Sequence, residues 1–239
     1  MHRVWFAVIP CAPRKEVGIL SISIAIALAA TAPVAPPPPV AVASTYTNEE
    51  EVYFDKEAGR APAPWIGVTI DTKGRPHWVD VYGKPALAPA GKIVRVFPAT
   101  IMVELAGGRR TTLLKARGAT CWVAIRKDKP KPDGKEDWYF TRDVKLHDQG
   151  GRAIAGGGDT GAQQVIVRMR NVIWPPPTSN KPSLVMYIHK PETPDRAESY
   201  SWADEDAVRV GINLRWMQSS CAIDRIGQAS EVTSKTVKG

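Results

Sequence analysis

The feature that most constrains the fold is a period of two in the hydrophobic residues of Ala207–Cys221. From Val208 to Trp216 every second residue is apolar, and the residues between them include Arg209 and Arg215. Successive side chains of a strand point to opposite faces, so this pattern predicts one dry face and one wet, basic face. A helix would need spacings of three and four. We therefore predict that this stretch is a central strand of an all-β domain.

The same alternation recurs in short runs after Trp65. Turn-forming glycine and proline residues separate the runs, and Gly107–Gly108 stands between two of them as a hairpin signal. Strands are thus predicted in residues 65–70, 77–82, 92–97, 100–105, 109–116, 119–125, 138–147, 164–173 and 183–189. Short strands at this spacing favour a single antiparallel β-sandwich, or a partly open barrel, over a parallel α/β fold.

Three local predictions accompany this architecture. A short N-terminal helix is expected over about Glu49–Glu57, where Thr47 or Asn48 could complete a capping box with a glutamate three residues on. Ser201 and Asp204 predict a single capped helical turn. Parity within residues 138–147 predicts that the inward side chains are Trp138, Phe140, Val144 and Leu146.

The N-terminus has the pattern of an export signal. Basic residues in positions 1–16 precede sixteen uncharged, mostly apolar residues, 17–32. Small residues offer cleavage after Ala32 or after Ala43, and the second site leaves Ser44 as the first mature residue. The alternative is an uncleaved anchor whose proline-rich segment, residues 33–39, forms a stiff stalk. We accordingly divide the chain into a signal and proline-rich segment (1–43), one β-sandwich domain (44–226) and a disordered tail (227–239).

Export determines how the cysteines are interpreted. Cys11 would be removed with the signal, which leaves Cys121 and Cys221 in the mature chain. In an oxidising compartment such a pair predicts a disulfide, and two unpaired core cysteines are the alternative. We expect the protein to be periplasmic or secreted, and to meet a membrane only through an uncleaved N-terminal segment.

Chemical motifs are nearly absent. His77, His147 and His189 lack metal-ligand spacing, so we interpret them as surface residues and expect no metal. Gly156–Gly161 is not followed by the Lys-Ser/Thr of a phosphate-binding loop, and no GxSxG elbow is present. We expect no cofactor, and we favour a protein that is not an enzyme.

Charge and tryptophan content suggest a binding surface. The net charge of +8 favours anionic partners, but no run of Lys or Arg is dense enough to predict nucleic-acid binding. If their strands are neighbours, four outward arginines would form a patch suited to carboxylate or phosphate polymers: Arg168, Arg170, Arg209 and Arg215. Three tryptophans at polar or loop positions could stack on sugars or anchor a partner: Trp78, Trp174 and Trp202.

These observations favour an exported, non-catalytic binding or assembly module of a bacterial-type cell envelope, whose partner is an envelope protein or an anionic polymer. The alternative function is a secreted hydrolase that acts on polysaccharide or peptide through carboxylates dispersed in the sequence.

Overall fold

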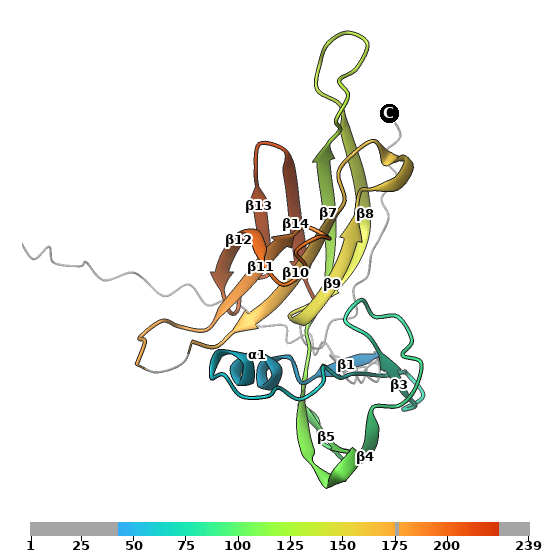
Figure 1. Ribbon diagram of the computed structural model, residues 1–239, viewed down its shortest axis with the longest axis vertical. Helices are drawn as coiled ribbons and strands as arrows, with labels where there is room; N and C mark the ends of the chain where they lie inside the picture. Colours follow the sequence, from blue (N-terminus) through green and yellow to red (C-terminus); the bar gives the residue numbers. More distant parts are fainter. Residues whose placement is uncertain (1–42, 175–176, 225–239) are drawn as a thin grey trace, which may run out of the picture. The chain divides into compact units, whose positions relative to one another are not determined.

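The computed structural model describes residues 43–174 and 177–224 and is mostly β, with one α-helix (Figure 1). The strands are β1 (Ser44–Thr47), β2 (Gly67–Ile70), β3 (Pro76–Val79), β4 (Gly91–Val96), β5 (Thr100–Leu105), β6 (Arg110–Lys115), β7 (Gly118–Arg126), β8 (Trp138–His147), β9 (Gln149–Ala155), β10 (Val165–Val172), β11 (Ser183–His189), β12 (Ala197–Asp204), β13 (Arg209–Asn213) and β14 (Met217–Ile223). The helix is α1 (Glu49–Glu57), and two 3₁₀ turns are η1 (Ala106–Gly108) and η2 (Gly158–Thr160). The predicted signal and proline-rich segment (1–43), except for Ala43, and the predicted tail (227–239) lie outside the described residues.

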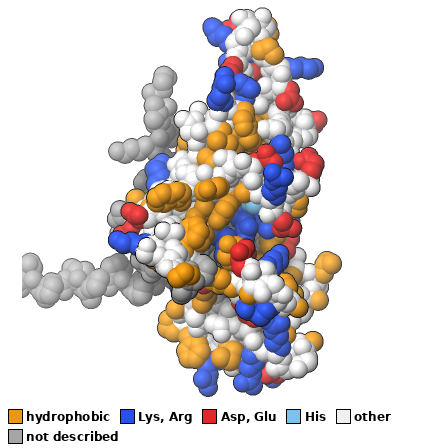
Figure 2. Space-filling model, turned by 60° about the vertical axis from the view of Figure 1, so that its left-hand side comes forward, with side chains coloured by type: hydrophobic (Ala, Val, Ile, Leu, Met, Phe, Trp, Pro, Cys, Tyr) orange, Lys and Arg blue, Asp and Glu red, His pale blue; other side chains and the backbone are white. Residues whose placement is uncertain are grey.

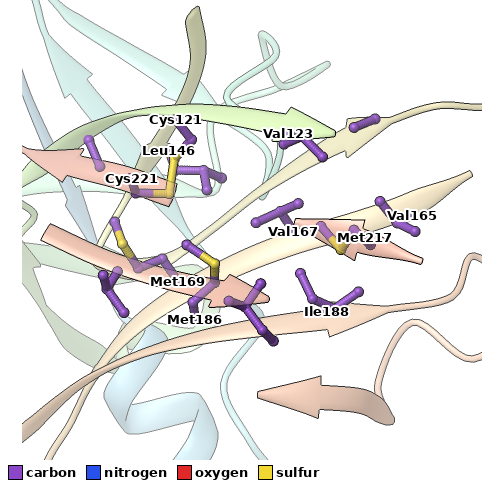
Figure 3. Packing of buried hydrophobic residues seen from close by; sticks show 14 of the residues in the cluster. Cys121, Val123, Leu146, Val165, Val167, Met169, Met186, Ile188, Met217 and Cys221 are labelled. Atoms are coloured by element: carbon purple, nitrogen blue, oxygen red, sulfur yellow. A yellow bond between two sulfur atoms is a disulfide. The ribbon is translucent and has the colours of Figure 1, made fainter. Parts of the chain in front are cut away.

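Two four-stranded antiparallel sheets enclose the main core, as the predicted all-β sandwich or partly open barrel requires. Their strand orders are β12-β11-β10-β9 and β13-β14-β7-β8. Alternate residues of each sheet point inward, and Figure 3 shows side chains from both sheets meeting around Met169 and Met186. β11 is buried on both faces, because Val185 and His189 are covered on the side away from this core.

A six-stranded antiparallel sheet, of order β3-β2-β1-β6-β5-β4, carries a second core. The sheet contains the hairpins β2–β3, β4–β5 and β5–β6, and the last of these is the hairpin predicted at Gly107–Gly108. In the β5–β6 hairpin the turn uses Gly107 at φ 79°, a left-handed conformation that glycine adopts without steric cost. The second core comprises Tyr46, Ile66, Val68, Ile101, Val103 and Leu113.

Helix α1 has the predicted bounds, but its start differs from the predicted capping box. Asn48 occupies the N-cap without capping the helix through its side chain. Its amide instead donates to the Pro64 carbonyl at 2.9 Å and accepts from the Ile66 backbone N–H at 2.7 Å. Three glutamates in the first turn favour the helix start through the macrodipole.

The distance between the sulfur atoms of Cys121 and Cys221 confirms that these two cysteines are paired, as predicted. Cys121 on β7 and Cys221 on β14 stand directly opposite each other, and their sulfur atoms lie at bonding distance, 2.03 Å (Figure 3). The cross-link joins residues that are 100 apart in sequence. In the chain-entropy model, a loop of that length contributes about 4–5 kcal/mol to stability.

The organising stretch Ala207–Cys221 is a hairpin rather than the single central strand predicted. β13 and β14 pair with each other, and β13 lies at the edge of its sheet. The chain reverses at Arg215 and Trp216, where the Leu214 N–H donates to the Met217 carbonyl at 2.8 Å. No glycine or proline marks this turn, so the apolar alternation runs through it unchanged.

Two further local predictions differ from the structure. In residues 138–147, Val144 and Leu146 face the main core as predicted, but Trp138 and Phe140 do not belong to it. Asp143 has a φ of 58° and lies beside a register shift between β7 and β8, a bulge that breaks the alternation of inward and outward residues. Phe140 is therefore 49% exposed, whereas Tyr139 packs against the main core. The helical turn predicted at Ser201–Asp204 belongs to β12, which pairs along its length with β11.

Candidate functional site

The candidate site is the face of β9–β12 that points away from the main core. We call it the arginine–aromatic face and define it by its polar and aromatic side chains: Arg152, Arg168, Arg170, Tyr187, His189, Tyr200 and Trp202. Strand alternation places them opposite the core residues Val167, Met169, Met186 and Ile188.

Strand register orders these side chains in rows across the sheet. In one row Arg152 pairs with Arg168, Arg168 with Tyr187, and Tyr187 with Tyr200. The Arg168 guanidinium lies 5.7 Å from the centre of the Tyr187 ring, which is 6.3 Å from the Tyr200 ring. The next row runs from Arg170 through Val185 to Trp202. Basic residues thus lie along β9 and β10, and the exposed aromatic rings lie on β12.

Glu49, the first residue of α1, is buried against the basic side of this face. One carboxylate oxygen accepts from Arg168 and lies 3.3 Å from Nε of Arg170. The other accepts from the Trp65 indole N–H at 3.0 Å. Gly150 permits this approach, since a Cβ there would lie 2.3 Å from the Glu49 carboxylate. We call Glu49 with these three partners the Glu49 clamp.

Helix α1 also covers the guanidinium of Arg170. The Tyr53 ring lies 3.8 Å from that guanidinium, a close cation–π contact, and Arg170 is only 2% exposed. Arg168 is also largely buried, with 14% of its side chain exposed. The sequence therefore predicted the direction of both arginines, but not their burial.

Several buried donors on this face lack hydrogen-bond partners among the described residues. They include Nε of Arg152, Arg168 and Arg170, and the single ring N–H of neutral His189, which is 1% exposed; its other ring nitrogen is an acceptor that also lacks a partner. An unsatisfied buried donor costs about 1–3 kcal/mol unless water or a ligand satisfies it. The Arg152 guanidinium makes only long contacts with the described residues, 3.4 Å to the Pro194 carbonyl and 3.6 Å to the exposed Asp195.

The buried His189 and the half-buried His147 are neutral at pH 7. Burial lowers the pKa of His189 to about 4, and nearby Arg168 and Arg152 act in the same direction. Burial likewise lowers the pKa of His147 to about 4, against the attraction of Glu49. Both were predicted to lie on the surface; this prediction is wrong for His189, which is buried, whereas His147 is half-buried. The positive charge of the arginine–aromatic face at neutral pH therefore comes from its arginines alone.

The aromatic side of the face is open to solvent. Tyr200 is 64% exposed and Trp202 is 66% exposed, although both belong to a regular strand. Figure 2 brings the side of β11 and β12 forward and shows apolar side chains beside a hollow lined with basic ones. Exposed apolar rings next to buried cations are typical of a binding surface rather than of a solvated sheet face.

The predicted binding residues are only partly brought together. Arg168, Arg170 and Trp202 share the arginine–aromatic face. Arg209 is exposed on β13 and Arg215 lies in the β13–β14 turn, both in the other sheet, so the predicted patch of four arginines does not form.

The other two predicted tryptophans lie elsewhere. Trp78, on β3, packs partly against the second core and lines a cavity of about 290 Å³ together with Trp65. Trp174 follows the end of β10 and is 39% exposed.

Sequence reasoning missed Arg152, Tyr187, His189 and Tyr200. Tyr200 and Trp202 alternate with Ser199, Ser201 and Ala203, which is a strand pattern, but small residues on the inner side conceal it. Glu49 was predicted as a helix residue, not as a partner of Arg168, which lies 119 positions away.

A second group of carboxylates lies around α1. Glu50 and Glu51 line a cavity of about 400 Å³ with Phe54, Thr111 and Leu114 among its walls. Burial raises the pKa of Glu50, whereas Glu51 accepts from Arg109 at 2.9 Å and from Thr111.

Asp148 lies outside that cavity's lining and is paired with Arg117, and burial raises its pKa despite that pairing. Within residues 43–174 and 177–224, no group of three or more His, Cys, Asp or Glu side chains is arranged to hold a metal ion.

No protein-family model matches the chain, and comparison with curated proteins and with solved structures found no match. What the arginine–aromatic face binds must therefore be inferred from its own residues.

We expect Glu49→Gln to lower the free energy of unfolding by about 3 kcal/mol, because removing one partner of a buried ion pair leaves the other charge uncompensated. Urea unfolding measures the change. Glu57→Gln, an exposed glutamate in the last turn of the same helix, is the matched control and should stay within about 0.5 kcal/mol of the unaltered chain. Equal midpoints for the two variants would show that the Glu49 clamp does not stabilise the fold.

Proposed function

We propose that this protein is an exported, non-catalytic binding module of a bacterial-type cell envelope, and that it binds an anionic envelope polymer through the arginine–aromatic face. The observation that carries this proposal is the pair Arg152 and Arg168, whose side chains keep 15% and 14% of their surface exposed and whose Nε donors have no hydrogen-bond partner among the described residues. Such donors suit the oxygens of a carboxylate or phosphate.

The charge balance of the face supports an anionic ligand. Arg152, Arg168 and Arg170 form ion pairs with one buried carboxylate, that of Glu49, and with Asp195, whose side chain is 81% exposed. Glu50, whose pKa burial raises, also attracts Arg170 without forming an ion pair with it. Solvent screens the Asp195 charge strongly and the buried charges weakly. The balance at the sheet surface is therefore positive, and the ligand needs no metal or cofactor to be recognised.

Three features support export. The basic and apolar segments at the N-terminus have the pattern of a secretory signal. The second candidate cleavage site, after Ala43, lies directly before β1, so cleavage there would leave the sheets complete. The cysteine pair lies at disulfide distance, as expected of a periplasmic or secreted protein.

Among the described residues no helix is long and apolar enough to span a bilayer.

We expect Arg152→Gln to weaken binding to a carboxylate polymer by about tenfold, since a hydrogen bond to a charged group contributes about 1.5–3 kcal/mol. Titrations of the purified chain with polygalacturonate and with polyglutamate measure this. Arg152 is the informative position because its removal leaves the Glu49 clamp intact.

Arg209→Gln is the matched control for that titration, because it removes the same charge from an exposed position in the other sheet. It should change the affinity by less than twofold. Equal losses from the two variants would indicate attraction to net charge only. An unaltered chain that binds neither polymer at low salt would exclude this proposed function.

Export predicts the state of each thiol. In protein recovered from the exported fraction, we expect Cys121 and Cys221 to resist alkylation until a reductant is added. Cys11 should be absent after cleavage and alkylated if the segment is retained as an anchor. A chain that lacks residues 17–32 should remain inside the cell with both core thiols reactive. Mass spectrometry of denatured, alkylated protein measures all three cysteines, and a reduced core pair in the exported fraction would contradict the proposal.

A second candidate function, a secreted hydrolase of polysaccharide or peptide, is favoured by the cavity beside α1. Glycosidases use one carboxylic acid of raised pKa and one carboxylate that stays ionised. Glu50 has a raised pKa because of burial, and Glu51 is held by Arg109 and Thr111. These two residues could therefore act as acid and base or nucleophile.

If the hydrolase proposal holds, the chain should shorten polygalacturonate or a peptide substrate, and Glu50→Gln should reduce that rate by at least about 100-fold. Measurement of new reducing ends or new amino termini tests this. Glu57→Gln is again the control on the same helix. No cleavage by the unaltered chain across pH 4–8 would leave the binding module as the sole proposal.

A further inference from the structure

We infer that the anionic ligand is an acidic polysaccharide, whose carboxylates contact Arg152 and Arg168 while its sugar rings stack on Tyr200 and Trp202. The inference rests on the proposed function and narrows it to one class of polymer. It depends on the aromatic side of the face, which the charge argument does not use.

The two exposed rings are arranged as a platform. Tyr200 and Trp202 are two residues apart on β12, so both point to the same side, about 7 Å apart along the strand. Neither ring is needed for the core, since each is more than 60% exposed. Aromatic rings are costly to leave in water and bind the apolar faces of other rings, which favours a ligand that covers them.

The platform and the cations are separated by one strand. Tyr200 pairs with Tyr187, which pairs with Arg168, and Trp202 is joined to Arg170 through Val185 in the same way. Neighbouring strands are about 4.8 Å apart, so β12, which carries the rings, and β10, which carries the arginines, are roughly 10 Å apart. A polymer that carries both rings and acids along its length can occupy both sides of the face. A flexible polyanion without rings can use only one.

The Glu49 clamp indicates which acid the arginines accommodate. Their present partner is a carboxylate, held by Arg168 and Arg170 and by an indole N–H. Nε of Arg152 and the single ring N–H of neutral His189 remain without hydrogen-bond partners among the described residues. The carboxylate of a uronic acid could accept hydrogen bonds from these free N–H donors, as the Glu49 carboxylate does from Arg168 and Trp65.

The experiment compares three polymers that separate ring from charge. Polygalacturonate carries both, polyglutamate carries only carboxylates, and dextran carries only sugar rings. We expect the purified full chain to bind polygalacturonate at least tenfold more tightly than either of the others. Trp202→Ala should weaken polygalacturonate binding about tenfold and polyglutamate binding less than twofold, and Tyr200→Ala should act in the same direction.

Phe140→Ala is the matched control, because Phe140 is an exposed aromatic residue beside a cation, Arg142, in the other sheet. It should leave all three affinities unchanged. Equal affinity for polygalacturonate and polyglutamate, or no effect of either β12 variant, would overturn the inference and leave the proposed function standing. If the chain bound neither polygalacturonate nor polyglutamate, both this inference and the proposed function would be overturned.

Discussion

The contact on which the structure most depends is that of Glu49 with Arg168 and Arg170. Glu49 begins α1 directly after β1, and its partners lie in the middle of β10, so the clamp joins the six-stranded sheet to the barrel-like pair of sheets. Burying these charges is costly and is tolerated only when the partners satisfy one another. Trp65 and Tyr53 complete this arrangement by hydrogen bonding to the carboxylate and stacking on Arg170. The disulfide stabilises the main core, on one face of β10. The Glu49 clamp instead covers the opposite face of β10, where Arg168 and Arg170 lie.

Much of the fold was predictable because local sequence and tertiary structure agree. The alternation of apolar residues identified most strands, and Gly107–Gly108 identified a hairpin. Predictions failed where that agreement is absent. The reversal at Arg215 and Trp216 uses residues without turn preference. The bulge at Asp143 exchanges the inward and outward residues of β8 on its two sides, whereas the sequence pattern predicts one unbroken alternation. β12 was missed because its inward residues are alanine and serine, too weakly apolar to produce a clear period.

The site was less predictable than the fold for a different physical reason. Parity placed Arg168 and Arg170 on the outward face correctly, but whether an outward arginine is solvated depends on what packs over it. The covering residues, Glu49 and Tyr53, are more than 110 positions away in sequence and belong to the helix. Nothing local distinguishes these two arginines from Arg209, which remained exposed. Of the four predicted arginines, only Arg168 and Arg170 therefore belong to the candidate site, because helix α1 packs over them.

The clamp also explains how a face that already holds a carboxylate can bind another anion. Arginine side chains lose substantial conformational freedom when they are immobilised, and a ligand that must order them loses affinity by that amount. Glu49 fixes Arg168 and Arg170 within the folded protein, so this entropy is lost on folding and not on binding. Each guanidinium carries five N–H donors, and one shared carboxylate cannot occupy all of them. Glu49 thus reduces the net charge of the face but leaves its remaining donors preorganised, beside aromatic rings that no part of the described chain covers.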